Sequence, residues 1–211
     1  MATLTSSSKI RRIFPAARQL LLEADINRHL PRESKRILVI GAGFDPYKAK
    51  FPHAELYIAA DIVFHHGATN IIADAMCLPF ADGAFDCVIA TEVAEHVRNP
   101  RQLIDEAYRV LGIDGKLILT VPFAFQEHAD PADYWRPTRW TLKEATEKFK
   151  LTNIWPQGNR LHVISDLITT AFAPRHPLVP LRIFNHLFIR RHCGHRRSTT
   201  CPSGYFVSAT K

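Results

Sequence analysis

The segment spanning residues 35–61, KRILVIGAGFDPYKAKFPHAELYIAAD, constrains the fold of this chain most strongly. Its apolar run from Ile37 to Ile40 is typical of a strand that is buried on both faces. Gly41 and Gly43 follow, and glycine lets the backbone turn sharply and approach a ligand closely. A short helix and a second apolar strand come next and end at Asp61, a carboxylate that can accept hydrogen bonds from a ribose diol. The pattern predicts a nucleoside site at the carboxyl edge of an open α/β sheet.

The distance of 20 residues from Gly41 to Asp61 also fits a dinucleotide-binding fingerprint. That fingerprint needs a third glycine at position 46, where this chain has Pro46. Proline has no backbone N–H to donate to a pyrophosphate. The turn therefore favours a nucleoside without phosphates.

Composition limits the class of protein. With 211 residues and 46% hydrophobic content, we expect one well-filled domain. The net charge of +7 favours acidic partners or an anionic surface without identifying either. The four cysteines lack disulfide or metal spacing, no apolar run approaches the ~18 residues of a membrane span, and no signal peptide is recognisable. These features predict a soluble cytoplasmic protein with reduced thiols.

Helical and strand patterns alternate along the chain, which predicts a doubly wound α/β sheet. We expect helices at 15–30, at 99–112 with Asn99 as N-cap, and at 141–148 with a capping box from Thr141 to Glu144. Further strands are expected at 70–73, 85–90, 116–121 and 151–155, with a last, edge strand at 204–209. Within a single domain, 1–211, the expected parts are an N-terminal helical cap (1–34), a cofactor-binding core (35–125), an acceptor loop with a helix and strand six (126–160), a helical insertion (161–203) and the last strand (204–211).

Residues 36–123 carry a family resemblance. The run ILVIGAGFDPY, the carboxylate Asp61 and the run IIADAMCLPFADGAFDCVIATEVAEHVRNPRQLIDEAYRVLGIDGKLILTVPF resemble class I S-adenosylmethionine-dependent methyltransferases. The similarity is to the small-molecule branch with a type 11 methyltransferase domain, which includes ubiquinone and sterol methylases. The resemblance implies a Rossmann-like sheet of seven strands whose last strand is antiparallel, S-adenosyl-L-methionine as cofactor, and methyl transfer as the reaction.

The resemblance also implies roles for individual residues. The predicted cofactor-binding residues are Gly41, Ala42 and Gly43 beside the amino-acid part, Asp61 and Ile62 at the ribose, Asp74, Ala75 and Met76 around the adenine, and Thr91 and Glu92 at the methionine moiety and the mouth of the acceptor pocket. Two positions depart from the family. Val39 replaces a usual acidic residue, and Asp45 replaces a usual glycine. We hypothesise that Asp45 takes over the contact with the ammonium group of the cofactor.

An oxygen acceptor must lose a proton, and an imidazole titrates near neutral pH. His128 is our first candidate for the catalytic base, with Tyr134 in the same loop. His96 is the competing candidate, although it can equally serve only to orient its neighbours. For each of these side chains the sequence supports a purely structural role, such as a capping or hydrogen-bonded polar group, as well as it supports a catalytic one.

The loop at 127–140, EHADPADYWRPTRW, is the expected acceptor region. Its aromatic and basic side chains suit a ring-shaped or anionic substrate, and the predicted substrate-binding residues are Glu127, Trp135, Arg136 and Arg139. The DYWRPT run is similar to methyltransferases found with polysaccharide and glycolipid synthesis genes, which favours a sugar- or lipid-linked acceptor. Alternatively, the tryptophans only pack the loop onto the sheet.

The C-terminal segment 181–197 has an apolar stripe next to a basic cluster. We favour a helix that covers the substrate pocket over an interfacial helix in peripheral contact with a membrane. The spacing of His192, Cys193, His195 and Cys201 matches no zinc motif, so we expect no metal, and no nucleic-acid-binding module is recognisable.

Two alternative functions remain open at the level of sequence. The first is a cofactor-binding interaction protein of the same fold that has lost turnover. Val39 and Asp45, which depart from the family pattern, are compatible with this alternative. An NAD-dependent oxidoreductase is disfavoured by Pro46 and by the DAMCLPF segment.

Overall fold

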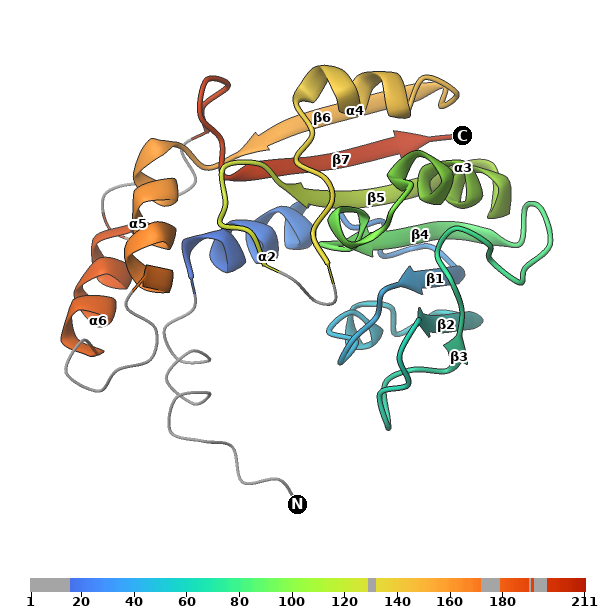
Figure 1. The fold of residues 1–211 in the computed structure, drawn as a ribbon. Helices are drawn as coiled ribbons and strands as arrows, with labels where there is room; N and C mark the ends of the chain where they lie inside the picture. The colour runs from blue at the N-terminus through green and yellow to red at the C-terminus, as the bar shows by residue number, and fades with distance from the viewer. Residues whose placement is uncertain (1–15, 129–131, 172–178, 190, 192–196) are drawn as a thin grey trace. The chain divides into compact units, whose positions relative to one another are not determined.

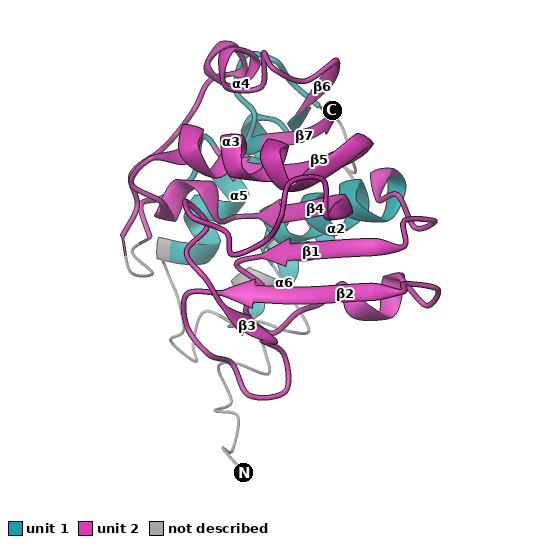
Figure 2. Cartoon of the chain, turned by 90° about the vertical axis from the view of Figure 1, so that its right-hand side faces the viewer, with its two compact units in different colours: residues 1–28, 123–126, 156–204 teal, residues 29–122, 127–155, 205–211 magenta. Residues whose placement is uncertain are grey.

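The computed structural model describes residues 16–128, 132–171, 179–189, 191 and 197–211 (Figure 1). Two compact units can be distinguished in the chain (Figure 2). Unit 1 comprises residues 1–28, 123–126 and 156–204, and unit 2 comprises residues 29–122, 127–155 and 205–211. The predicted single domain, 1–211, and its internal boundaries stay a prediction.

A sheet of seven strands forms the framework of unit 2. Its strands are β1 (Arg36–Ile40), β2 (Leu56–Asp61), β3 (Ile71–Ile72), β4 (Phe85–Thr91), β5 (Leu111–Pro122), β6 (Leu151–Gln157) and β7 (Gly204–Thr210). They lie side by side in the order β3-β2-β1-β4-β5-β7-β6. The pairs β1–β2, β1–β4, β2–β3 and β4–β5 are parallel, and Figure 1 shows the β7 arrow pointing opposite to β5 and β6. The predicted doubly wound sheet of seven strands is therefore confirmed.

The central strands are apolar because they are covered on both faces. Ile37, Val88 and Ile118, one from each of three adjacent strands, are fully buried. Helix α3 (Pro100–Val110) contributes Leu103 and Ile104 to this core. Asn99 caps α3 as predicted, since its side chain accepts a hydrogen bond of 3.3 Å from the N–H of Gln102.

The described residues form further helices and turns. They are α2 (Ala17–His29), α4 (Arg139–Ala145), α5 (Arg160–Ala171), α6 (Val179–Phe188), and the 3₁₀ turns η1 (Lys48–Lys50) and η2 (Ala94–His96). None of the helices in the described ranges is both long and apolar enough to cross a membrane.

Three local expectations were wrong. The N-cap of α4 lies three residues before the predicted one, because the Thr138 side chain accepts from the N–H of Thr141. Strand β7 lies between β5 and β6 and is not an edge strand, consistent with the complete burial of Phe206 and Val207. The helix expected to reach residue 112 ends at Val110, where β5 begins at once.

Unit 1 contains α2, α5 and α6, and buried carboxylates tie its segments together. Asp166 on α5 accepts a hydrogen bond of 3.1 Å from the N–H of Arg18, in the first turn of α2. Asp25 on α2 accepts from Gln157 at 3.0 Å and from Arg197 at 2.5 Å. These contacts satisfy charges that would be costly to bury alone.

Candidate active site

The parallel register of three strands brings the predicted cofactor residues to one edge of the sheet. Ile40 of β1 is level with Ala60 of β2 and with Ala90 of β4. The next residues, Gly41, Asp61 and Thr91, therefore stand in line at the carboxyl ends of these strands. This edge is where open α/β sheets bind their ligands.

Gly41 and Gly43 both adopt left-handed backbone conformations, with φ of 63° and 53°. A Cβ atom at Gly41 would lie 2.3 Å from Cγ2 of Val93, whereas a Cβ at Gly43 would have no atom within 4 Å. Gly41 is thus required by the packing of the turn. Gly43 faces open space and leaves a cradle that a Cβ would partly fill.

Asp61 fastens this turn to the end of β2. Its Oδ2 accepts a hydrogen bond of 2.8 Å from the N–H of Gly43, and its Oδ1 accepts one of 3.1 Å from the N–H of Val63. A carboxylate has about four lone-pair sites, so two sites remain for hydroxyl donors. Asp61 can therefore hold the glycine turn and a ribose at the same time.

Asp45 is also left-handed, with φ of 45°, and already has partners within the chain. The hydroxyl of Tyr57 donates to its Oδ1 at 2.6 Å, and the N–H of Tyr47 donates at 3.3 Å. Burial, and then this hydrogen bond to Asp45, raise the pKa of Tyr57. The hypothesis that Asp45 contacts the cofactor ammonium group stays a prediction.

Asp74 begins a tight turn after β3. Its Oδ1 accepts a hydrogen bond of 2.8 Å from the N–H of Met76, and Gln102 of α3 donates to the carbonyl of Met76 at 2.8 Å. The Asp74 side chain is exposed, and Ile62 at the end of β2 is 65% exposed. These groups offer a carboxylate and apolar surface of the kind that an adenine ring requires.

Glu92 has a strained backbone, with φ of 54°. It is held by Thr120 of β5, whose carbonyl accepts from the Glu92 N–H at 3.0 Å and whose hydroxyl donates to Glu92 Oε1 at 2.8 Å. The preceding residue, Thr91, shares a hydrogen bond of 2.7 Å with the hydroxyl of Tyr47. The end of β4 is therefore fixed on two sides.

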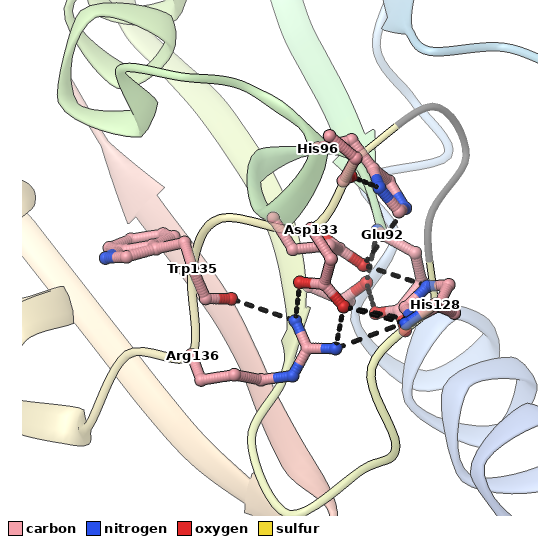
Figure 3. A network of polar contacts seen from close by, with 9 residues as sticks. Glu92, His96, His128, Asp133, Trp135 and Arg136 are labelled. Atoms are coloured by element: carbon pink, nitrogen blue, oxygen red, sulfur yellow. Dashed lines mark hydrogen bonds and ion pairs between the residues drawn. The ribbon is translucent and has the colours of Figure 1, made fainter.

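The two histidines that the sequence offered as rivals are neighbours (Figure 3). The ring centroids of His96 and His128 are 4.9 Å apart, and the rings are nearly perpendicular at 87°. His96 belongs to η2 after β4, and His128 to the loop after β5. The structure thus brings together both candidates for handling a proton.

Asp133 and Arg136 organise the loop around His128 (Figure 3). Arg136 binds both carboxylate oxygens of Asp133, and the N–H of His128 donates to Asp133 at 3.0 Å. Burial opposes ionisation of Asp133, but Arg136 and the His128 N–H hold the pKa of its carboxyl below the usual range. Arg136, predicted to bind substrate, is thus engaged within the loop.

The other predicted acceptor and catalytic residues are more peripheral. Tyr134 is 49% exposed, with the Arg98 guanidinium 5.8 Å from its ring centroid. Arg139 lies over Trp140 at 5.0 Å, and both line a cavity of about 740 Å³ between α4 and β6. Glu127 is exposed and Trp135 is half-buried.

Glu95 and Asp133 were missed by the sequence reasoning. The Glu95 side chain is completely buried on η2, and its backbone carbonyl accepts a hydrogen bond of 2.6 Å from the N–H of Tyr134. For Glu95 the available signal was its place between Ala94 and His96 in the turn EVAEHV, directly before a histidine.

Comparisons with known proteins identify similar methyltransferases. Residues 42–119 match the model of a methyltransferase domain family. An uncharacterised methyltransferase of Mycobacterium leprae is 30% identical over 43% of this chain and 38% of its own length. The chloroplastic tocopherol O-methyltransferase of Arabidopsis thaliana is 34% identical over 38% of this chain and 22% of its own length.

The fold is that of a solved SAM-dependent methyltransferase from Archaeoglobus fulgidus. The two structures superpose with a TM-score of 0.60 over 95% of this chain and 97% of the other, at 19% sequence identity. The chain spans less than half the length of the first curated relatives that it matches.

Proposed function

We propose that this chain, which carries a class I methyltransferase domain, transfers a methyl group from S-adenosylmethionine to a small-molecule acceptor. The observation that supports the proposal best is the alignment of Gly41, Asp61 and Thr91 at one sheet edge, with Gly43 bonded to Asp61 at 2.8 Å. An acidic residue tied to a glycine turn is suited to hold a ribose beside a closely approached backbone.

The residues at this edge fit the cofactor. The open space beside Gly43 leaves room for its amino-acid part, Asp61 retains lone pairs for the ribose, and Asp74 can accept from the adenine amine. When bound, the cofactor supplies a methyl group that is already activated on a sulfonium sulfur.

The protein then needs mainly to position the acceptor in line with the methyl group and to exclude water. Such positioning can lower a barrier by ~7–11 kcal/mol. The fixed end of β4, where Glu92 is held by Thr120, is a rigid platform for this task. His128 and His96 are the groups that we propose to handle the acceptor proton, because their rings lie together in the adjoining loop.

For the acceptor we propose a sugar- or lipid-linked molecule. The similarity to a tocopherol O-methyltransferase supports an oxygen nucleophile. The cavity beside Arg139 and Trp140 offers a cation and an aromatic face for an anionic or ring-bearing group.

Exposed apolar residues of α6 support a further part of the proposal, contact with a lipid acceptor or a membrane surface. Phe184 is 67% exposed, Leu187 56% and Phe188 37%. A helix that covers a substrate pocket presents the same face before substrate binds. Co-sedimentation with anionic phospholipid vesicles separates the two roles, since only surface contact is lost on Phe184→Ser in the absence of substrate.

A cytoplasmic location is part of the proposal. Cys77, Cys87 and Cys201 are free thiols in the described part of the chain, which supports a reducing compartment.

Two measurements test the proposal in sequence. Calorimetry with S-adenosylmethionine, S-adenosylhomocysteine and NAD should show saturable binding of the first two alone; NAD binding in their place would favour an oxidoreductase. Methyl transfer to a panel of phenols, sugars and lipid-linked sugars should then find an acceptor. Tight cofactor binding without transfer to any member would favour the inactive interaction protein.

A further inference from the structure

Three side chains that can bind a metal converge beside the end of β4. Glu95 and His96 come from η2, and His128 comes from the loop after β5. One ligand atom from each lies within 4.8 Å of the others. We propose that Glu95, His96 and His128 form a binding site for a divalent transition-metal cation, which the sequence pattern did not predict.

The geometry suits a shared cation. Glu95 Oε1 lies 3.8 Å from Nε2 of His96 and 4.0 Å from Nε2 of His128. Ligands held ~2.0–2.2 Å from a zinc-like ion stand about 3–3.5 Å from one another. Glu95 Oε1 and each imidazole nitrogen therefore have to close by less than about 1 Å, and the ligand atoms of the two histidines lie within 4.8 Å of one another.

The hydrogen bond behind His96 fixes its tautomer. Its Nδ1 lies 2.6 Å from the carbonyl oxygen of Ala132, which can only accept, so Nδ1 carries the proton. In the neutral ring this leaves the lone pair on Nε2, the atom that faces Glu95. Such a backbone contact commonly orients histidines that ligate metals.

His128 is supported in a similar way. Its Nδ1 lies 3.4 Å from Oδ2 of Asp133. An Arg136 nitrogen is also 3.4 Å from Nδ1, but Arg136 is bound to both oxygens of Asp133. Because Arg136 can only donate, its contact favours a lone pair on Nδ1, and cation binding at Nε2 requires the other tautomer, in which the Nδ1 proton faces Asp133. Asp133 is thus a positioning residue for the site.

The ligand types indicate the class of cation. Two imidazoles and one carboxylate suit Zn²⁺, Fe²⁺, Co²⁺ or Mn²⁺, whereas Ca²⁺ and Mg²⁺ prefer oxygen ligands alone. Three protein ligands also leave at least one coordination position open, as catalytic sites do and closed structural sites do not. The site can therefore bind an additional oxygen ligand.

The location suggests a use for that open position. Figure 3 shows Glu92, at the end of β4, in the same network as His96 and His128. A cation lowers the pKa of a hydroxyl that it binds. With the cation bound, His96 and His128 would promote proton loss through the cation and not as bases: an acceptor hydroxyl would lose its proton to solvent, and its oxygen would attack the methyl carbon as the carbon–sulfur bond breaks and its electron pair passes to sulfur. This use rests on the proposed function, whereas cation binding rests on the three residues alone.

Calorimetry on the full chain tests cation binding. The protein is stripped with EDTA, dialysed and titrated with ZnCl₂ and with MnCl₂, and bound metal is counted by mass spectrometry. We expect one ion per chain, at least ~10-fold weaker binding in His128→Asn and in Glu95→Gln, and ~10- to 100-fold weaker binding in Asp133→Asn. His53→Asn, an exposed histidine before β2, is the matched control and should bind as the parent does.

Two results would overturn the site: no saturable binding of either ion by the parent, or parental affinity in His128→Asn. Because Glu95 is fully buried, folding of each variant is checked by thermal unfolding, and at one Zn²⁺ concentration the melting temperature of the parent should rise more than those of the folded variants. S-adenosylhomocysteine is titrated into the same samples. If the parent binds S-adenosylhomocysteine but no cation, only the cation site is refuted. If it binds the cation but no S-adenosylhomocysteine, the proposed function is refuted and the cation site is retained.

Discussion

Replacing Gly43 by alanine separates the effect of the glycine turn on folding from its effect on cofactor binding. At φ of 53° the left-handed backbone conformation costs an alanine ~1–2 kcal/mol of folding free energy. No atom lies within 4 Å of the added Cβ, so no clash adds to this cost in the free protein. The expected loss of stability is therefore about 1–2 kcal/mol.

The same substitution should also weaken cofactor binding. The added methyl group enters the space that the bound cofactor is expected to occupy, and forcing one carbon into a packed site costs ~1–3 kcal/mol. The dissociation constant for S-adenosylhomocysteine should thus rise about 5- to 150-fold. Calorimetric titration gives this constant, and urea unfolding gives the stability.

Gly83→Ala is the matched control. Gly83 has φ of 70° and lies before β4, at the opposite edge of the sheet, and its added Cβ would meet its nearest atom at an ordinary 3.8 Å. It should lose similar stability without losing affinity. Gly41→Ala should be less stable than either variant, because its Cβ would lie 2.3 Å from Val93. If Gly43→Ala loses no more affinity than Gly83→Ala, the reasoning about the turn is refuted.

Two further predictions concern stability. Burial raises the pKa of Asp166 to about 6 despite the backbone N–H donors of Arg18 and Ala17. The contribution of Asp166 to the free energy of unfolding is therefore fully present below the unfolded pKa of 3.8, and it is lost as the pH rises through 6. Between pH 4 and 7 the parent should lose up to ~3 kcal/mol relative to Asp166→Asn in urea unfolding; parallel pH profiles would contradict this. Asp86 accepts from the N–H groups of Lys35 and Arg36 and from the Arg36 side chain, at the amino edge of the sheet. Asp86→Asn should therefore cost ~1–2 kcal/mol of unfolding free energy and leave the nucleoside affinity unchanged. A parallel loss of affinity would contradict the placement of the nucleoside site at the opposite, carboxyl edge of the sheet.

Local patterns predicted the strands and the turn at the cofactor edge. β1 and β4 followed from short, mainly apolar runs, and the sharp turn followed from Gly41 and Gly43, because each depends on residues close in sequence. The cap of α4 was misplaced because Thr138 and Thr141 both suit an N-cap, and only the packed loop selects between them. Local sequence alone therefore could not decide which of the two threonines caps α4.

Long-range contacts were beyond the sequence. The place of β7 between β5 and β6 depends on pairing across the sheet, which no local pattern of 204–210 specifies. The approach of His96 to His128 joins positions 32 residues apart, and Glu95 and Asp133 matter only once that approach is made. The sequence therefore supplied candidate groups, and the fold decided which of them act together.

Equilibrium binding of S-adenosylhomocysteine to the parent, to Asp61→Asn and to Asp74→Asn is the decisive measurement for the nucleoside site. We expect one nucleoside per chain and at least ~10-fold weaker binding in each variant, since a neutral amide replaces a charged acceptor worth ~1.5 kcal/mol more. Absence of binding by the parent, or equal affinity in all three proteins, would contradict this expectation.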